Sequence, residues 1–112
     1  MKLITAVIKP LKLDDVCDAL ARLGISGLTV MEVRGYGRKP RRTEQYGGGD
    51  YSANFLPRLK IEVAVSSGEA DRVVDAIIAA AQTGRVGDGK IFVLDLAEVV
   101  RIRTREKGAD AL

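Results

Sequence analysis

A glycine-rich segment that ends in a lysine carries the clearest chemical signal in this 112-residue sequence. Residues 83–90 read Thr-Gly-Arg-Val-Gly-Asp-Gly-Lys. Closely spaced glycines permit tight turns whose N–H groups point into one concavity, and such concavities bind phosphate. Lys90 adds a positive charge at the mouth. The spacing is not that of a GxxxxGK[ST] loop, because Ile91 follows the lysine. By itself the pattern also fits a helix cap followed by a turn.

A second cationic pair, Arg101 and Arg103, lies near the C-terminus. Residues two apart on a strand point to the same side, so both side chains can hold one anion. The alternative is a charged edge strand that blocks aggregation. Taken together with residues 83–90, the pair describes a site for an adenine nucleotide, either ATP or ADP, with AMP also possible.

The composition excludes several kinds of chemistry. The chain has no histidine, which removes histidine-based zinc sites and Ser-His-Asp catalysis. Cys17 is the single cysteine, so neither an internal disulfide nor a CxxC motif can form. No apolar run approaches the roughly 20 residues of a membrane span, and the N-terminus lacks the features of a signal peptide. We therefore expect a cytoplasmic protein.

The positive charge is unevenly distributed. The net charge of the chain is +3, but residues 34–42 carry +5 and residues 100–107 carry +3, so the remainder is acidic. Two local basic patches on an acidic body indicate anion sites and not a coat for long nucleic acid. The strands that we expect contain only Tyr36 and Phe92 as aromatics, which is too few for an RNA-binding sheet. We expect no nucleic-acid partner.

Apolar spacing and turn residues predict a single α+β domain over residues 1–112. The predicted strands are residues 2–9, 28–36, 58–66 and 90–96, the predicted helices are residues 13–23 and 69–82, and a short tail strand follows at residues 99–103. The order βαββαβ is that of the ferredoxin-like plait. Its special segments are a long loop (37–55), the glycine-rich loop (82–90) and a basic C-terminal segment (97–112).

The strands expected at residues 2–9 and 90–96 are apolar on both sides. Two helices can cover only one face of a four-stranded sheet. The other face needs a cover, and a partner subunit is the simplest one.

The loop of residues 37–55 is long for a compact domain and contains Pro40 and three consecutive glycines at 47–49. Loops of this length without periodicity are usually functional or disordered. Tyr46, Tyr51 and several cationic residues favour a functional loop, for example one that presents a tyrosine to a partner or a modifying enzyme. The alternative is a flexible surface loop without such a role.

In this context several motifs resemble the PII signal-transduction family along nearly the whole chain. They are Ile8-Lys9-Pro10, Gly35-Tyr36-Gly37-Arg38, Thr43-Glu44, Asp50-Tyr51, Phe55-Leu56-Pro57, the run from Thr83 to Val93, and Arg101-Ile102-Arg103-Thr104. The resemblance implies a non-enzymatic homotrimer in which ATP and ADP compete for three clefts between subunits. It also implies that the long loop binds target proteins, such as a transporter or a metabolic enzyme, so that contact with a membrane is only indirect.

The resemblance further implies site residues. The phosphates would be held by Gly87, Gly89 and Lys90 together with Arg38, Arg101 and Arg103, and the adenosine would lie near Val7, Thr29, Glu62 and Ala64. Gly35, Gly37 and Asp88 complete the nucleotide set. In many relatives the tyrosine at the Tyr51 position is uridylylated, and 2-oxoglutarate binds with Mg²⁺ beside ATP.

Two substitutions depart from the family pattern. Lys39 stands where the family carries a glutamine whose amide oxygen helps to hold Mg²⁺, and an ammonium offers no lone pair to a cation. Arg58 replaces the usual lysine and can still pair with a carboxylate. Lys39 and Arg58 are therefore candidates for a metal-independent anion site, and the role of Mg²⁺ stays open.

The leading hypothesis is a trimeric sensor that reports adenylate state to target proteins in nitrogen or carbon metabolism. The alternative is a divergent PII-like sensor in carbon metabolism that couples the nucleotide to another small anion such as bicarbonate. A small phosphate-processing enzyme is the third hypothesis, and it lacks a convincing general base.

Overall fold

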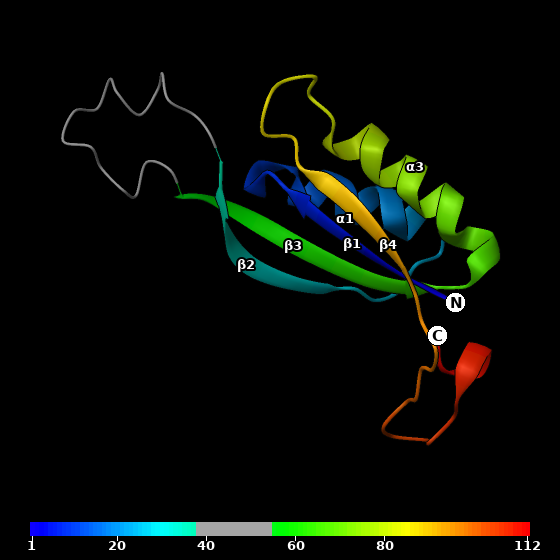
Figure 1. Cartoon of the computed structure of the whole chain (residues 1–112). Coiled ribbons are helices and arrows are strands. Elements are labelled where there is room, and N and C mark those ends of the chain that lie inside the picture. The colour runs from blue at the N-terminus through cyan, green and yellow to red at the C-terminus, as the bar shows by residue number, and fades with distance from the viewer. Residues whose placement is uncertain (38–54) are drawn as a thin grey trace, which may run out of the picture.

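The computed structural model describes residues 1–37 and 55–112. Its elements follow the predicted βαββαβ order (Figure 1). The strands are β1 (Lys2–Ile8), β2 (Thr29–Tyr36), β3 (Phe55–Val65) and β4 (Lys90–Asp95), and the helices are α1 (Leu13–Arg22) and α3 (Ala70–Ala81). Short 3-10 turns add η1 (Pro10–Lys12), η3 (Ser67–Glu69) and η4 (Gly108–Ala111). The predicted α+β fold class is confirmed.

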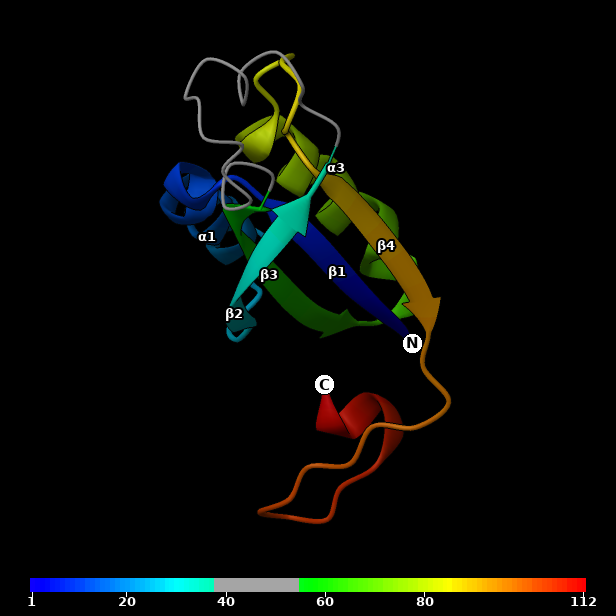
Figure 2. The same ribbon diagram turned by 60° about the vertical axis from the view of Figure 1, so that its left-hand side comes forward.

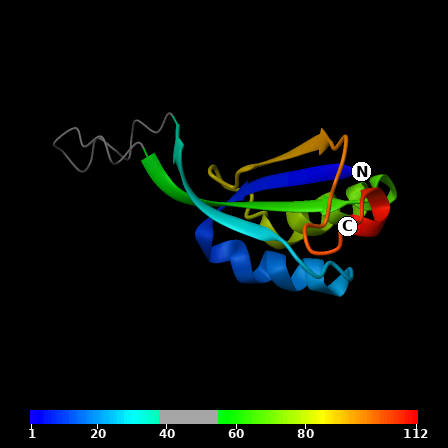
Figure 3. The ribbon, with the colours of Figure 1, turned by 90° about the horizontal axis from the view of Figure 1, so that it is seen from below.

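The four strands form one antiparallel sheet in the order β2-β3-β1-β4. Both helices pack on the same side of this sheet (Figure 3). The core between them is built from alternate strand residues and one stripe of each helix: Ile4, Ala6, Ile8, Val16, Leu20, Ile61, Val63, Val65, Ala70, Val73, Ile77 and Ala81. The period-two and helical patterns of the sequence therefore identify the buried face correctly. Cys17, beside Val16, is half-buried.

α1 illustrates why these residues form a helix. Pro10 opens the preceding η1 turn, where its missing N–H costs nothing. Asp14 and Asp15 lie in the first turn of α1 and Arg22 in its last turn, as the helix dipole favours. Gly24, at a φ of 84°, then ends the helix with a conformation that side chains with a Cβ rarely adopt.

The described residues leave the face of the sheet opposite the helices open (Figure 3). On it Phe92 and Leu94 of β4 are about half exposed (50% and 48%). A shallow hollow of about 620 Å³ lies between them and the polar side chains of Thr5, Lys60 and Glu62. The predicted apolar character of β4 on both sides is thus confirmed, whereas β1 adds Thr5 to this face and the adjoining strand β3 adds charge.

β3 begins three residues before the predicted strand and includes Pro57. Proline cannot donate a ladder hydrogen bond, so it is confined to positions with a free edge. Pro57 fits this rule, because it pairs with Arg34 of β2 while pairing with β1 starts only at Leu59. β2 and the start of β3 therefore extend as a two-stranded arm beyond β1, and the rings of Tyr36 and Phe55 lie 4.9 Å apart at its tip.

The predicted tail strand at residues 99–103 is wrong. After an isolated bridge between Val100 and Lys107 the chain turns at residues 102–104 and ends in η4. The cause is Glu106, whose carboxylate accepts hydrogen bonds from the Arg101 guanidinium (2.5 Å) and the Thr104 hydroxyl (2.7 Å). These contacts fold the segment back on itself. It lies apart from the sheet, at the opposite end of β4 from the glycine-rich loop (Figure 2).

Ile77 should be among the most costly core positions to truncate. Its side chain is 1% exposed, whereas that of its neighbour Ile78 is 44% exposed. We expect Ile77→Ala to reduce the free energy of unfolding by about 2–5 kcal/mol, because the cavity left in the core is only partly closed. Ile78→Ala should cost clearly less. Urea unfolding of both variants at equal protein concentration checks this, and equal losses would contradict the assigned buried face.

Candidate functional site

The glycine-rich loop between α3 and β4 has the backbone conformation that its glycines predict. Gly84 has a φ of 82°, and Gly87 and Gly89 each have a φ of 100°. The chain leaves α3 through Gln82 in an extended conformation and returns to the sheet at Lys90 (Figure 1). We call residues 83–90 the glycine turn. Left-handed glycines at positions 87 and 89 are compatible with a turn in which neighbouring N–H groups point to one side, as they do in anion-binding nests.

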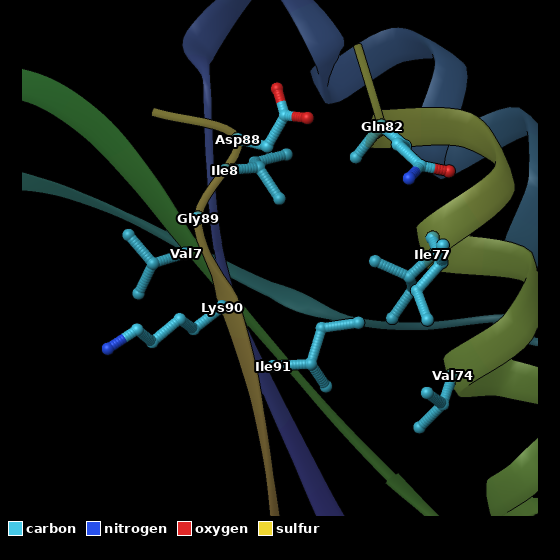
Figure 4. A pocket seen from close by; sticks show the side chains of 11 residues that line it. Val7, Ile8, Val74, Ile77, Gln82, Asp88, Gly89, Lys90 and Ile91 are labelled. Carbon is cyan, nitrogen blue, oxygen red and sulfur yellow. The ribbon is translucent and has the colours of Figure 1, made fainter. Parts of the chain in front are cut away.

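Gly89 is required by packing as well as by its dihedral angle. A Cβ atom at this position would overlap the carbonyl oxygen of Val7. Because Val7 lies on the central strand β1 and pairs with Lys90, this approach brings the glycine turn directly against the sheet. Figure 4 shows Val7 and Lys90 on the side of the strands away from α3, while Ile91 points toward α3.

The Asp88 carboxylate is the centre of the hydrogen bonds inside the turn. One oxygen, Oδ2, accepts from the N–H groups of Thr83 (2.8 Å) and Gly84 (2.9 Å). The other, Oδ1, accepts from the Thr83 hydroxyl (2.5 Å) and lies 3.1 Å from Lys9 Nζ. The Thr83 hydroxyl and N–H hold the pKa of Asp88 well below its ordinary value of 3.8 against a smaller effect of desolvation, and Lys9 and Gly84 add to the lowering. Asp88 is therefore a carboxylate throughout the physiological pH range.

Cationic side chains approach the turn at Gly87. A Cβ built on Gly87 would lie 3.0 Å from a guanidinium nitrogen of Arg58 and 3.5 Å from Cε of Lys9. The stem of Arg58 passes Gly35 at a similar distance, 3.5 Å from the Cβ position there. The two predicted glycines thus make room for the predicted cation. Arg58, Gly35 and Gly87 form one cluster in the described part of the chain.

An apolar cavity of about 430 Å³ lies beside the turn, between α3 and the strands β1 and β4. Val74, Ile77 and Ile91 line it, and Gln82, Asp88 and Gly89 stand at its upper end (Figure 4). Sequence reasoning did not single out this cavity. It also missed the roles of Lys9 and Thr83, although Lys9 stands in the Ile8-Lys9-Pro10 motif and Thr83 begins the glycine-rich segment.

The predicted adenosine contacts lie on the open face of the sheet. Strand register puts Thr29, Glu62 and Thr5 in one row across β2, β3 and β1. Val7 is two residues closer to the glycine turn on β1, and Ala64 is in the next row away from it. One step of two residues is about 7 Å along a strand. Measured along the strands from Val7, the row of Glu62 is therefore one such step away and the row of Ala64 is two steps away.

Arg101 and Arg103 are not brought to the glycine turn of the same chain. They lie in the folded-back C-terminal segment, beyond the far end of β4 (Figures 1 and 2). The expectation that they point together from one strand is wrong, since Arg103 sits in the turn and Arg101 pairs with Glu106. Ile102, which separates them, is 95% exposed, as expected for a residue in a turn that packs against none of the described strands.

Three further predicted residues, Arg38, Lys39 and Tyr51, fall outside the described residues, as does all but the two ends of the 37–55 loop. Gly37, the last residue described before them, is exposed. Among the described residues no group of three or more His, Cys, Asp or Glu is placed to hold a metal ion. Within the same residues no helix has both the length and the apolar character needed to span a membrane.

Fold and site together define a ferredoxin-like α+β domain with a glycine turn packed against the central strand of its sheet. A family model described as nitrogen regulatory protein P-II matches residues 1–106. Over all 112 residues, and over the full length of each relative, the chain is 56% identical to nitrogen regulatory protein P-II of Rhizobium etli and 54% identical to nitrogen regulatory protein GlnK of Escherichia coli K12. It is 55% identical to nitrogen regulatory protein P-II of Klebsiella oxytoca over the same span. The chain belongs to the nitrogen regulatory protein P-II family.

The overlap at Gly89 gives a sharp test of the site geometry. Alanine at Gly89 and alanine at Gly84 both suffer a positive φ, at about 1–2 kcal/mol each. Only at Gly89 does the new methyl group meet the Val7 backbone, because none of the described residues has an atom within 4 Å of the corresponding position at Gly84. Gly89→Ala should therefore unfold at clearly lower urea concentration and shift the amide resonances of Val7 and Ile8. Equal effects of the two substitutions would show that the turn does not press on β1.

Proposed function

We propose that this chain is a regulatory protein of nitrogen metabolism that binds ATP or ADP and transmits the adenylate state to target proteins. Its membership of the P-II family, in which the relatives carry the name nitrogen regulatory protein, supports a signalling role and not a catalytic one. We place it in the cytoplasm. The 37–55 loop would be the contact to targets, including transporters or metabolic enzymes, and Tyr51 its modification site.

The geometry of the glycine turn is the main support for the proposal that the protein binds a nucleotide. It combines left-handed glycines at positions 87 and 89 with the guanidinium of Arg58 at Gly87 and the ammonium of Lys90 at the exit. Backbone N–H groups and flexible cations together suit the several oxygens of a polyphosphate. The open sheet face beside Val7 offers a surface for the adenosine.

The distance between the turn and the C-terminal arginines supports a site shared between two copies. Within one chain the C-terminal segment that contains Arg101 and Arg103 lies at the opposite end of β4 from the glycine turn (Figure 2). They can join the phosphates only if a neighbouring subunit supplies them. The half-exposed Phe92 and Leu94 on the open face support such a neighbour, because a homotrimer would cover them.

Mixing two defective variants tests the shared site. Lys90→Ala and Arg103→Ala should each weaken ATP and ADP binding about tenfold, since each removes a charge-assisted contact. In a mixed trimer, an interface between a subunit with intact Lys90 and a neighbour with intact Arg103 rebuilds one complete site. Calorimetry on the refolded mixture should therefore recover a fraction of tight sites. If the mixture binds no better than either variant, both residues act within one chain or not at all.

The residues at positions 58 and 39 support a second candidate effector. Arg58 reaches Gly87, and in the sequence Lys39 stands where the family carries a glutamine. Two cations can hold a small anion directly, whereas Mg²⁺ needs an oxygen ligand from the protein or from water. This supports an anion such as bicarbonate in place of the Mg²⁺-dependent 2-oxoglutarate of the family.

Calorimetry with ATP and Mg²⁺ present separates these effectors. We expect weak or absent binding of 2-oxoglutarate to the native protein and a gain of binding in Lys39→Gln, which restores an amide oxygen. Bicarbonate titrated without Mg²⁺ should bind the native protein better than Lys39→Gln. Arg22→Gln, which removes a charge from the last turn of α1, is the control and should change neither. Tight 2-oxoglutarate binding that Lys39→Gln leaves unchanged would contradict the anion site.

A further inference from the structure

The arrangement around Asp88 differs from that of a residue that binds a ligand. Oδ2 accepts two backbone N–H groups, and Oδ1 receives the Thr83 hydroxyl and the Lys9 ammonium. Two carboxylate oxygens offer about four acceptor positions, so this carboxylate is fully occupied from within the protein. Its negative charge would also repel a phosphate. Asp88 is therefore poorly suited to touch the nucleotide, although it lies between Gly87 and Gly89.

The same contacts close the glycine turn into a ring. Asp88 joins the end of the turn to its start at Thr83 and Gly84, and the N–H of Arg85 donates to the Thr83 hydroxyl (3.2 Å). Glycine loses more conformational freedom on ordering than any other residue. A turn with three left-handed glycines would sample many shapes without such a tie.

Lys9 anchors this ring to the sheet. It follows the last residue of β1, and its Nζ lies 3.1 Å both from Asp88 Oδ1 and from the Thr83 hydroxyl. Pro10 restricts the backbone next to it. The aliphatic end of Lys9 also passes Gly87. The ammonium thus neutralises Asp88 beside the proposed phosphate site and fixes the position of the turn relative to β1.

We propose that Lys9, Thr83 and Asp88 form a lock that holds the glycine turn in its binding conformation before a ligand arrives, with Asp88 as a positioning residue and not a ligand contact. The effect of the lock on affinity rests on the proposed nucleotide function. Its effect on the turn itself exists without any ligand. Preorganisation of this kind raises affinity, because the binding step no longer orders the loop.

Substitutions that keep the size of each side chain test the lock. In Asp88→Asn an amide nitrogen faces either two backbone donors or the Lys9 ammonium, so the ring of hydrogen bonds cannot close. Thr83→Val removes only the hydroxyl, and Thr83→Ser keeps it. Asp95→Asn is the matched control, because Asp95 pairs with Lys2 on the surface, and its side chain is 86% exposed.

Two readouts are needed, the first of them without ligand. Hydrogen exchange of the ligand-free protein by NMR should be about tenfold or more faster at Gly84 in Asp88→Asn and at Arg85 in Thr83→Val. In Thr83→Val the Arg85 N–H loses its hydroxyl acceptor. In Asp88→Asn the charged acceptor of the Gly84 N–H is replaced by a neutral amide oxygen or by no acceptor, depending on the orientation of the amide. Thr83→Ser and Asp95→Asn should match the native protein. Unchanged exchange in Asp88→Asn and Thr83→Val would overturn the lock.

The second readout is the affinity for ATP by calorimetry, with thermal melts to confirm that each variant is folded. Asp88→Asn and Thr83→Val should bind about tenfold more weakly, and Thr83→Ser should bind as the native protein does. Faster exchange with unchanged affinity, or weaker affinity with unchanged exchange, would refute the positioning role. If the native protein itself binds no ATP, the proposed function fails, whereas the exchange data still decide whether the lock exists.

Discussion

The approach of Gly89 to the carbonyl of Val7 is the contact on which the site depends. It allows no side chain at position 89, and it brings the loop that leaves α3 against the central strand of the sheet. Because Val7 also pairs with Lys60 of β3, the loop is positioned by the strand with neighbours on both sides. A flexible edge strand would give a glycine turn no fixed reference. Here the glycine turn and Lys90 are both positioned directly against β1, which also forms part of the open sheet face.

The electrostatics around the turn follow from that placement. A carboxylate at Asp88 is unexpected next to the proposed anion site, and its electrostatic cost is limited because Lys9, the Thr83 hydroxyl and two N–H groups surround it. Its lowered pKa keeps the charge, and so the hydrogen bonds, across the pH range of the cell. The contribution of this group to stability is present above the ordinary pKa of aspartate and is lost as the pH falls through its lowered folded-state pKa. On the proposed function, Arg58 and Lys90 are the cations of the described residues left to face the nucleotide.

Most of the fold could be predicted, because its determinants are local. Alternating apolar residues in β1 and β3, the apolar stripes of α1 and α3, and glycines 24 and 84 identify the elements to within a few residues. The prediction of a strand in the C-terminal segment was wrong for a reason that no local sequence pattern reveals. Arg101 and Arg103 have strand-like spacing, but a carboxylate five residues beyond Arg101 draws it into a turn. Likewise, Lys9 and Thr83 are 74 residues apart, so their contact needed the three-dimensional structure.

The separation of the cationic groups has a consequence for assembly. Each chain carries the glycine turn at one end of β4 and the C-terminal arginines at the other (Figure 2). On the proposed arrangement a nucleotide touches both only at the junction of two copies, so it binds the assembled form and not the separated chains. Mass action then makes every bound nucleotide favour assembly. In the proposed trimer, burial of the apolar surface of Phe92 and Leu94 on the open face would drive assembly without a ligand. A ligand at the proposed junction would then alter the relative position of subunits that are already assembled, which is what a protein that signals through a change of conformation requires.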